Sequence, residues 1–308
     1  MSGARNMSGT VTAVIPTRNR PELLRKAIRA MLKQEGGHLA EIVVVFDQSE
    51  PDESLTAMSD DIPIRVVTNT RQPGLAGARN TGIELAGSEW IAFCDDDDMW
   101  HGDKLNRQCR AVTDDPEAHF AVGSVIVAYG DKRVHRKTAL QVIGLDDLLR
   151  DRVMEAHPST YLVRRSAINR WGLVDEELPG GYAEDYDWLL RAARVRSILV
   201  VPDAVTEIQW HPKSYFGNRW ATIDSALEFL VDKTPEFSGE PRGLARILGQ
   251  RAFAQAAMGE TRRSLASAWK TFRLDWRQPR AYIAPVVASR IISADRLVKW
   301  ANATGRGF

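Results

Sequence analysis

Short apolar runs alternate with stretches of helical character over the first hundred residues. The runs are rich in β-branched residues and have the length of buried strands: 10–16, 41–46, 64–68 and 90–94. Residues 21–35 show a 3.6-residue apolar periodicity after Pro21, and residues 74–87 are predicted to be mostly helical. Strands that alternate with helices form right-handed βαβ units. The pattern therefore predicts an α/β fold with a doubly wound, mostly parallel sheet flanked by helices.

Beyond residue 115 the pattern is less regular. Strands are predicted at 120–129, 159–163 and 197–201, and a helix at about 184–193. From Trp220 onward a helical pattern runs to the last residue, without an internal repeat or a low-complexity linker before it. We expect a disordered lead-in, an α/β domain in two halves and a helical C-terminal extension: 1–9, 10–115 with 116–220, and 221–308.

The composition is that of an ordinary globular chain. Its 308 residues are 44% hydrophobic and 26% charged, which excludes a disordered, collagen-like or disulfide-stapled protein. Two cysteines, Cys94 and Cys109, give neither a disulfide framework nor a cysteine-based zinc site, and they fit a reducing cytoplasm. No apolar run is long enough for a signal peptide or a membrane span, so we expect the protein to act in the cytoplasm.

The charge is unevenly distributed along the chain. The net charge of +1 argues against a nucleic-acid partner. From Arg242 onward, however, 13 Lys and Arg residues stand against 3 Asp and Glu residues. Residues 281–300 also mix apolar and basic side chains. This segment fits peripheral contact with the inner face of a membrane, or equally a tail that packs on the preceding domain.

Four adjacent carboxylates, Asp95 to Asp98, follow the predicted strand 90–94 directly. Such groups repel one another unless a cation or solvent relieves them. Hard oxygen ligands in this number suit Mg²⁺ or Mn²⁺ together with substrate phosphates. The alternative is an acidic turn that caps a helix starting near His101, although one Asp would suffice for a cap.

Three other segments carry candidate chemistry. Glu184 and Asp185 follow a glycine pair at a helix start, where a carboxylate could act as a general base, or could simply complement the helix dipole. Arg79 lies in a glycine-bearing helix start that could face the anionic part of a nucleotide. His211 could reach a metal or diphosphate, or could be structural. Residues 157–160 could line an acceptor pocket, or form a turn before an edge strand.

Taken together, several segments resemble the inverting family 2 glycosyltransferases of the GT-A fold. They are VIPTRNRPELL, VVVFDQSEPD, GLAGARNTGI, FCDDDDMW and GYAEDYDWLLRA, and the resemblance covers roughly residues 10–215. It implies a GT-A catalytic domain over 10–220, with a nucleotide-binding half and an acceptor half. The implied activity moves a sugar from a nucleotide diphosphate to a hydroxyl acceptor, with Mn²⁺ or Mg²⁺ on the diphosphate. The acceptor would be a sugar, a glycan, a lipid-linked molecule or a natural product.

The resemblance also implies roles for individual residues. Asp185 corresponds to the catalytic base with Glu184 beside it, and Asp97 to a metal ligand, with His211 as a second candidate ligand. The remaining candidates would bind the nucleotide and the donor sugar: Pro16, Thr17, Arg18, Arg20, Asp47, Arg79, Asp95 and Asp96. Asp95 and Asp96 are also candidates for contact with the metal, and the run of four aspartates keeps Asp98 as an alternative. One position departs from the family pattern, because Phe46 stands where an acidic residue often reads the nucleobase. A nucleotidyltransferase of similar fold and a non-catalytic binding homologue remain the alternative interpretations.

Overall fold

The computed structural model describes residues 9–210 and 219–303. The chain groups into two compact units, which we describe separately. The sheet unit comprises the described residues of 1–145, 153–176 and 184–210, and the helical unit those of 146–152, 177–183 and 211–308. The lead-in predicted over residues 1–9 lies, except for Gly9, outside the described residues.

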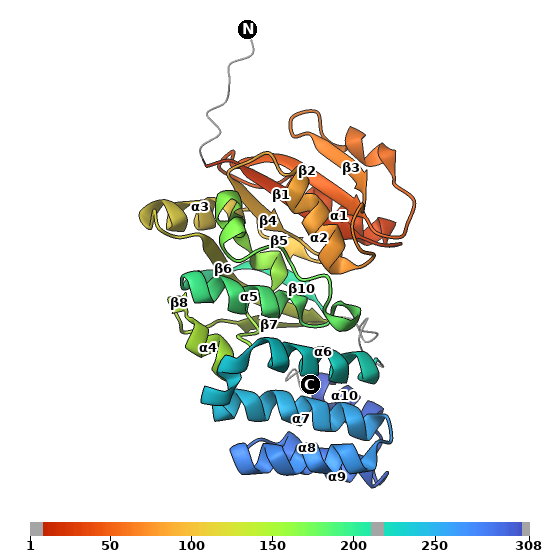
Figure 1. Ribbon diagram of the computed structural model, residues 1–308. Helices are drawn as coiled ribbons and strands as arrows, with labels where there is room; N and C mark the ends of the chain where they lie inside the picture. Colours follow the sequence, from red (N-terminus) through yellow and green to blue (C-terminus); the bar gives the residue numbers. More distant parts are fainter. Residues whose placement is uncertain (1–8, 211–218, 304–308) are drawn as a thin grey trace. The chain divides into compact units, whose positions relative to one another are not determined.

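The sheet unit is built on one sheet in the order β3-β2-β1-β4-β9-β6-β10-β5, with β7 beside β6 and β8 beside β10. Figure 1 shows the N-terminal strands side by side. The strands are β1 (Val11–Thr17), β2 (Leu39–Phe46), β3 (Ile64–Thr68), β4 (Trp90–Phe93), β5 (Met99–Trp100), β6 (Phe120–Tyr129), β7 (Lys132–Arg136), β8 (Val142–Ile143), β9 (Leu162–Arg164) and β10 (Ile198–Gln209).

The long strands run in one direction. β1 pairs in parallel with β2 and β4, β2 with β3, and β6 with β10. β9 is antiparallel to both β4 and β6, so that β6 and β10 point the same way as the first four strands. The carboxyl ends of these strands therefore lie along the same edge of the sheet. The predicted mostly parallel α/β sheet is confirmed.

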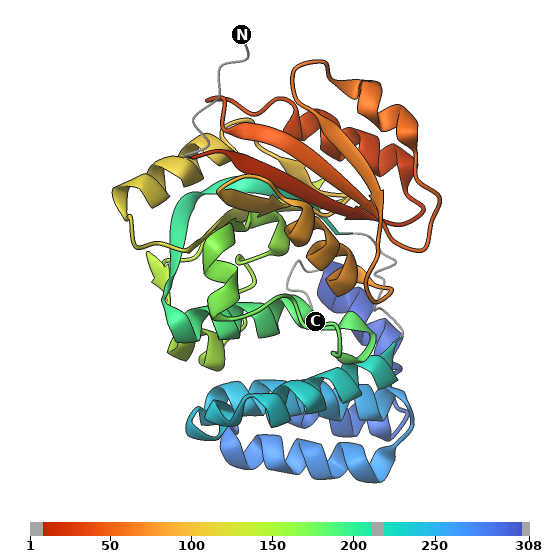
Figure 2. The same cartoon turned by 45° about the horizontal axis from the view of Figure 1, so that its top comes forward.

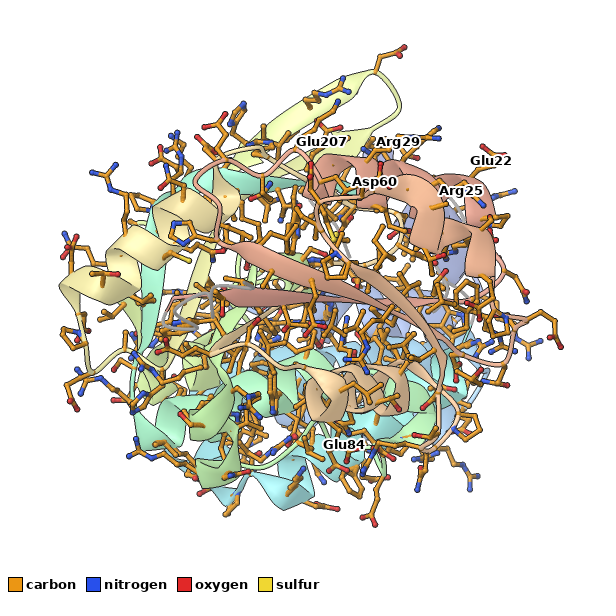
Figure 3. All side chains as sticks on the ribbon, turned by 90° about the horizontal axis from the view of Figure 1, so that it is seen from above. Glu22, Arg25, Arg29, Asp60, Glu84 and Glu207 are labelled. Carbon is orange, nitrogen blue, oxygen red and sulfur yellow. The ribbon has the colours of Figure 1, made fainter. Side chains whose placement is uncertain are left out.

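Helices cover both faces of this sheet. Helices α1 (Pro21–Met31) and α3 (Lys104–Asp114) pack their apolar residues against one face, where Ala13, Ile15 and Val44 lie in the same core cluster. Helix α2 (Leu75–Leu85) packs on the other face, so close that a Cβ at Gly82 would lie 2.2 Å from Cγ1 of Val14. Figure 2 shows α1 and α2 on opposite sides of the strands. The outer side of α1 carries charged residues instead, among them Glu22, Arg25 and Arg29 (Figure 3).

Helix α5 (Glu184–Val195) completes the second face with an aromatic core. The Trp188 ring lies 5.7 Å from that of Phe93 and 5.6 Å from that of Phe120, both edge-on. Trp188 Nε1 donates to the carbonyl of Gly172, 2.9 Å away. This packing fixes the start of α5 relative to the end of β4, where the acidic segment begins.

The structure differs from the sequence prediction in several short elements. The strand predicted to start at 159 begins at Leu162, because Pro158 opens a 3-10 turn, η2 (Pro158–Thr160). The strand predicted to end at 201 continues in β10 to Gln209, past register shifts between Val201 and Thr206. The strands β5, β7 and β8 are not predicted by the sequence pattern. Nor are the other short 3-10 helices: η1 (Glu53–Met58), η3 (Arg165–Arg170), η4 (Pro179–Gly181) and η5 (Pro235–Gly239).

The helical unit confirms the predicted helical C-terminal region. Its helices are α6 (Trp220–Lys233), α7 (Pro241–Ala257), α8 (Thr261–Leu274), α9 (Arg280–Ala288) and α10 (Ala294–Ala303), joined by most of α4 (Leu145–Arg150). Helices α7 and α8 lie side by side in both cartoon views (Figures 1 and 2). Phe253 of α7 lies in one core cluster with Val287 and Ala294. Among the described residues, no helix has the length and apolarity needed to cross a bilayer.

Candidate active site

The loop after β1 and the acidic segment after β4 meet because β1 and β4 are neighbours in the sheet. Thr17 Oγ1 donates a hydrogen bond of 2.8 Å to Oδ2 of the buried Asp96. Arg20 Nη1 donates to Asp96 Oδ1 at 3.1 Å and to Asp97 Oδ2 at 2.8 Å. Burial raises the pKa of Asp96, although Thr17 and Arg20 oppose the shift. Of the other predicted loop residues, Pro16 is buried within β1 and Arg18 is exposed.

Arg79 on α2 links the acidic segment to the start of α5. Its guanidinium donates from Nη2 to Asp95 Oδ1 at 2.8 Å and from Nη1 to Glu184 Oε1 at 2.6 Å. Arg79 and Glu184 are both almost fully buried. Burial alone would lower the pKa of Arg79, but the two carboxylates outweigh it and raise that pKa above its usual value. Nε of Arg79 is buried without a hydrogen-bond partner among the described residues.

Asp185 follows Glu184 in the first turn of α5 and is half-buried. Its Oδ1 accepts a hydrogen bond of 2.8 Å from the backbone N–H of Tyr186. The preceding residue, Ala183, adopts a φ of +65°, so the chain turns sharply where the helix begins. Arg79 thus joins Asp95 to Glu184, the residue before Asp185. The predicted Arg79 and Glu184 are bonded to each other, and the charge of Asp185 also acts on Arg79.

Asp98 lies at the buried end of the acidic segment. Its Oδ2 accepts from Ser159 Oγ at 2.5 Å, and its Oδ1 accepts from the backbone N–H of Gln209 at 3.2 Å. The same Ser159 hydroxyl accepts from the N–H of Asp95 at 3.0 Å. Burial and the charges of Asp95 and Asp97 raise the pKa of Asp98 well above its usual value. Its surroundings therefore disfavour the ionised form of Asp98, and a nearby positive charge would favour it.

A group of metal-binding type lies at this point. One ligand atom each from Asp95, Asp98 and His157 falls within 4.8 Å of the others, and His157 Nδ1 is 3.5 Å from Asp98 Oδ2. Two carboxylates and an imidazole suit a divalent cation such as Mn²⁺, and the crowding of negative charge there favours one. The residues therefore fit a bound cation.

The metal ligands predicted from sequence were Asp97 and His211. In the structure Asp97 contacts Arg20, and His211 lies outside the described residues. Both assignments stay predictions. Asp98 belongs to the acidic run that the sequence predicts to bind a metal, whereas His157 was expected in an acceptor pocket or a turn and not among the ligands. Their proximity depends on how η2 packs against the end of β4.

Asp47 organises the loops at the ends of β2 and β3. Its Oδ1 accepts from Asn69 Nδ2 at 2.8 Å and from the N–H of Gly74 at 3.0 Å, while Oδ2 accepts from Gln48 Nε2 at 2.9 Å. Gly74 has a φ of +131°, a backbone conformation that suits glycine, and stands at the N-cap of α2. Asp47 therefore positions the helix that carries Arg79, and its predicted contact with the nucleotide stays a prediction.

Sequence analysis did not identify two groups that hold the site. Asn80 donates from Nδ2 to the carbonyl of Val174 at 2.8 Å and to Glu176 Oε1 at 2.6 Å, and its Oδ1 accepts from the Val174 N–H at 2.9 Å. These bonds fix α2 to the segment that leads toward α5. The only signal in the sequence was the adjacency of Asn80 to Arg79, which did not reveal a partner 94 residues away.

The second group is Lys104 on α3. Its side chain is fully buried, lies 4.4 Å from the centroid of the Trp100 ring, and donates to Gln108 Oε1 at 2.6 Å. Gln108 Nε2 in turn donates to the carbonyl of Thr160 in η2 at 2.6 Å. Burial lowers the pKa of Lys104 to about 7. This chain of contacts supports η2, which contains Ser159 and begins after His157.

A comparison with known protein families shows which family the chain belongs to. A family described as Glycosyl transferase family 2 matches residues 12–172, which is more than half of the chain. This chain belongs to glycosyl transferase family 2. The matched region contains the loop after β1, Asp47, Arg79 and the whole acidic segment; Asp185 lies beyond it.

The individual relatives share about 30% of their residues with parts of this chain. The chain is 28% identical over 141 residues to the Escherichia coli enzyme WfgD, a UDP-Glc:alpha-D-GlcNAc-diphosphoundecaprenol beta-1,3-glucosyltransferase, covering 46% of this chain and 55% of that one. It is 31% identical over 228 residues to the pre-mycofactocin glycosyltransferase of Mycobacterium tuberculosis H37Rv, covering 69% of this chain and 47% of that one. The chain thus spans about half the length of these two relatives.

Solved structures share the fold over nearly the whole chain. S. aureus TarS 1–349 in complex with UDP-GlcNAc superposes with a TM-score of 0.62 and 16% identity, covering 96% of this chain and 92% of that one. The mannosyltransferase PcManGT from Pyrobaculum calidifontis, in complex with GDP-Man and Mn²⁺, gives a TM-score of 0.54 and 19% identity, covering 96% and 80%. The family membership and the fold together identify the sheet unit as GT-A in type.

Proposed function

We propose that this family 2 member transfers a sugar from a nucleotide diphosphate to a hydroxyl acceptor, with inversion at the anomeric carbon. The observation that carries the proposal is the buried bridge through Arg79, which joins Asp95 after β4 to Glu184 beside Asp185. It supports a single site with donor-binding groups on one side and a base on the other. The neighbours solved with UDP-GlcNAc and GDP-Man agree with a donor of this class.

On the donor side, Asp95, Asp98 and His157 are the residues that would hold a divalent cation, with Asp97 as the candidate from sequence. Such a cation supplies positive charge that stabilises a departing diphosphate. Arg20 adds a partly exposed guanidinium at the same loop, and its charge suits a diphosphate. Thr17 keeps Asp96 in place, so that this carboxylate can accept hydrogen bonds from the donor's hydroxyl groups.

On the acceptor side, we assign Asp185 as the general base. One of its carboxylate oxygens takes the proton from the acceptor hydroxyl while that oxygen attacks the anomeric carbon and the bond to the diphosphate breaks. An attack on the face opposite the leaving group inverts the configuration in one displacement. A carboxylate needs no unusual pKa for this task, because an ordinary Asp is ionised at neutral pH.

The relatives favour a sugar hydroxyl as the acceptor. WfgD is named for transfer to a GlcNAc carried on diphosphoundecaprenol, and the Rhizobium meliloti relative ExoO is named for succinoglycan biosynthesis. A cytoplasmic place of action, expected from the low cysteine usage, is part of the proposal, and Cys94 and Cys109 are both free and buried.

A panel of nucleoside diphosphates tests the donor site. Purified protein is heated with UDP, GDP, dTDP, ADP or CDP, each with and without Mn²⁺. One nucleotide should raise the unfolding temperature only when metal is present, since a ligand at about 100 times its Kd stabilises the native state by roughly 2.7 kcal/mol. No stabilisation by any nucleotide with Mn²⁺ would contradict the proposal.

Two variants localise the effect. Asp98→Asn keeps the shape of the side chain and should abolish the part of the stabilisation that depends on Mn²⁺. The matched control is Asp60→Asn, because Asp60 is an exposed carboxylate remote from the acidic segment in sequence (Figure 3). If both variants respond to Mn²⁺ as the wild type does, Asp98 is not part of the cation site.

A further inference from the structure

We propose that the outer face of α8, with the turn that leads to α9, docks on an anionic lipid surface. This inference concerns the helical unit alone and goes beyond the proposed reaction. The surface is an aromatic patch formed by Trp269, Phe272, Trp276 and Tyr282. The two tryptophans are 60% and 61% exposed, unusual values for such large apolar side chains.

The patch is continuous. The rings of Trp269 and Phe272 stack with centroids 5.7 Å apart, and the ring of Tyr282 meets Phe272 edge-on at 6.0 Å. The Tyr282 hydroxyl donates to the carbonyl of Trp276 at 2.6 Å. These contacts hold the rings of Trp269, Phe272 and Tyr282 together outside the core and tie Tyr282 to the backbone of Trp276, whose side chain is also exposed. A preformed aromatic surface loses little side-chain entropy when it binds.

The opposite side of α8 explains why the aromatic side faces outward. Ser264, Ala268 and Thr271 are buried, and Ser264 Oγ donates to the carbonyl of Ala252 in α7 at 2.8 Å. Small residues let α8 lie close to α7, so the helix is already anchored without its aromatic residues. Leu265, Trp269 and Phe272 recur at helical spacing on the outer side, and nothing in the core requires them there.

Basic side chains accompany the patch. Between Thr261 and Ala288 the sequence holds six Lys and Arg residues and one acidic residue, Asp275. Arg263 pairs with Asp224 and Glu260 inside the helical unit. Four of the others form no ion pair within the described ranges 9–210 and 219–303: Arg262, Lys270, Arg273 and Arg277.

This combination fits an anionic bilayer better than a second copy of the chain. Trp and Tyr rings favour the headgroup level of a membrane, where one edge is apolar and the other is wet. Unpaired Lys and Arg side chains gain attraction from anionic lipids. In a symmetric dimer through the same patch, these like charges would face one another and repel.

The apolar residues predicted for membrane contact within 281–300 divide between two environments. Val287 is buried, and Ile283, Leu297 and Val298 pack against the core cluster around Phe253. Val286, Ile291 and Ile292 are exposed, but they lie outside the contacts that define the aromatic patch. The lipid-facing surface is therefore assigned to α8 and the start of α9 rather than to the last helix.

Vesicle flotation tests the assignment. The full chain is mixed with vesicles of phosphatidylcholine alone, or of phosphatidylcholine and phosphatidylglycerol in equal parts, at low and high ionic strength. We expect binding only to the anionic vesicles, weakened by salt. Trp269→Ser with Trp276→Ser should abolish it, and Lys270→Gln with Arg273→Gln should weaken it about 30-fold, since each basic residue at such a surface contributes about fivefold.

Matched controls separate the patch from general stickiness. Trp300→Ser removes an exposed tryptophan from α10, and Arg29→Gln with Arg110→Gln removes two exposed charges from the sheet unit; both variants should bind as the wild type does. Absence of binding to anionic vesicles, or equal binding by all variants, would overturn the proposal. A dimer in sedimentation that the Trp269→Ser, Trp276→Ser variant abolishes, without vesicle binding, would replace the lipid with a second copy.

Discussion

The two units depart from the usual distribution of side chains in opposite directions. The sheet unit buries charge, with Arg79, Asp98 and Lys104 each no more than 3% exposed, whereas the helical unit exposes Trp269 and Trp276. Buried charge destabilises a fold unless it is paired, and an exposed aromatic cluster gains nothing for folding. The first arrangement therefore depends on the partners of the buried charges, and the second is not explained by folding. We therefore expect chemistry in the first unit and contact with a partner surface in the second.

The largest expected effect comes from removing the charge that holds the buried network. Arg79→Met leaves Asp95 and Glu184 without their shared cation and should lower the free energy of unfolding by about 3–5 kcal/mol, measured by urea denaturation. Arg20→Met is the control, because Arg20 is 41% exposed and its ion pairs contribute about 1 kcal/mol or less. Equal losses for the two variants would show that the burial of Arg79 does not matter.

A smaller, pH-dependent effect should come from Lys104. Its pKa is about 7 in the folded protein, below the usual 10.5, so between these values the unfolded chain binds the additional proton. Stability should therefore rise with pH and fall as pH drops toward 7. The free energy of unfolding of the wild type and of Lys104→Met is measured from pH 7 to 8.5, a range chosen to stay below the usual thiol pKa. Over this range the wild type should gain about 1.5 kcal/mol relative to the variant. If the difference in free energy of unfolding between the two proteins does not change with pH, Lys104 is not neutral in the folded protein.

The smallest expected effect is the most telling for the helical unit. Trp269→Ser with Trp276→Ser should change the free energy of unfolding by no more than about 0.5 kcal/mol, because both side chains lie at the surface. The buried Trp188→Ser in α5 should instead cost about 3–5 kcal/mol. The free energy of unfolding is measured by thermal unfolding for the wild type, the surface double variant and Trp188→Ser. A large loss for the surface pair would mean that these aromatics serve folding rather than contact.

The sequence sufficed for the parts of the fold that depend on local patterns. The apolar runs predicted β1 to β4 and the order of helices between them, because buried parallel strands and amphipathic helices each carry their own periodicity. The short strands β5, β7 and β8 escaped prediction. A strand as short as β5 (Met99–Trp100) is stabilised by pairing with β10 rather than by its own sequence.

The candidate site was predictable in its residue types but not in its pairings. Four consecutive aspartates look alike in sequence, yet Asp96 and Asp97 contact Arg20, Asp95 contacts Arg79, and Asp98 contacts Ser159. These differences arise from strands and turns distant in the chain. The proximity of His157 to Asp98 likewise depends on the 3-10 turn at Pro158, where the sequence pattern predicts a strand or a turn before it.

We propose that Asp185 acts as the base beside a donor site held together by Arg79. The measurement is the rate at which Asp185→Asn releases nucleoside diphosphate from its sugar nucleotide, using the nucleoside diphosphate that stabilises the wild type, with donor affinity measured in parallel and Glu84→Gln as an exposed control. We predict a rate loss of about 10²- to 10⁴-fold with unchanged donor affinity. A variant that keeps the wild-type rate would contradict the claim.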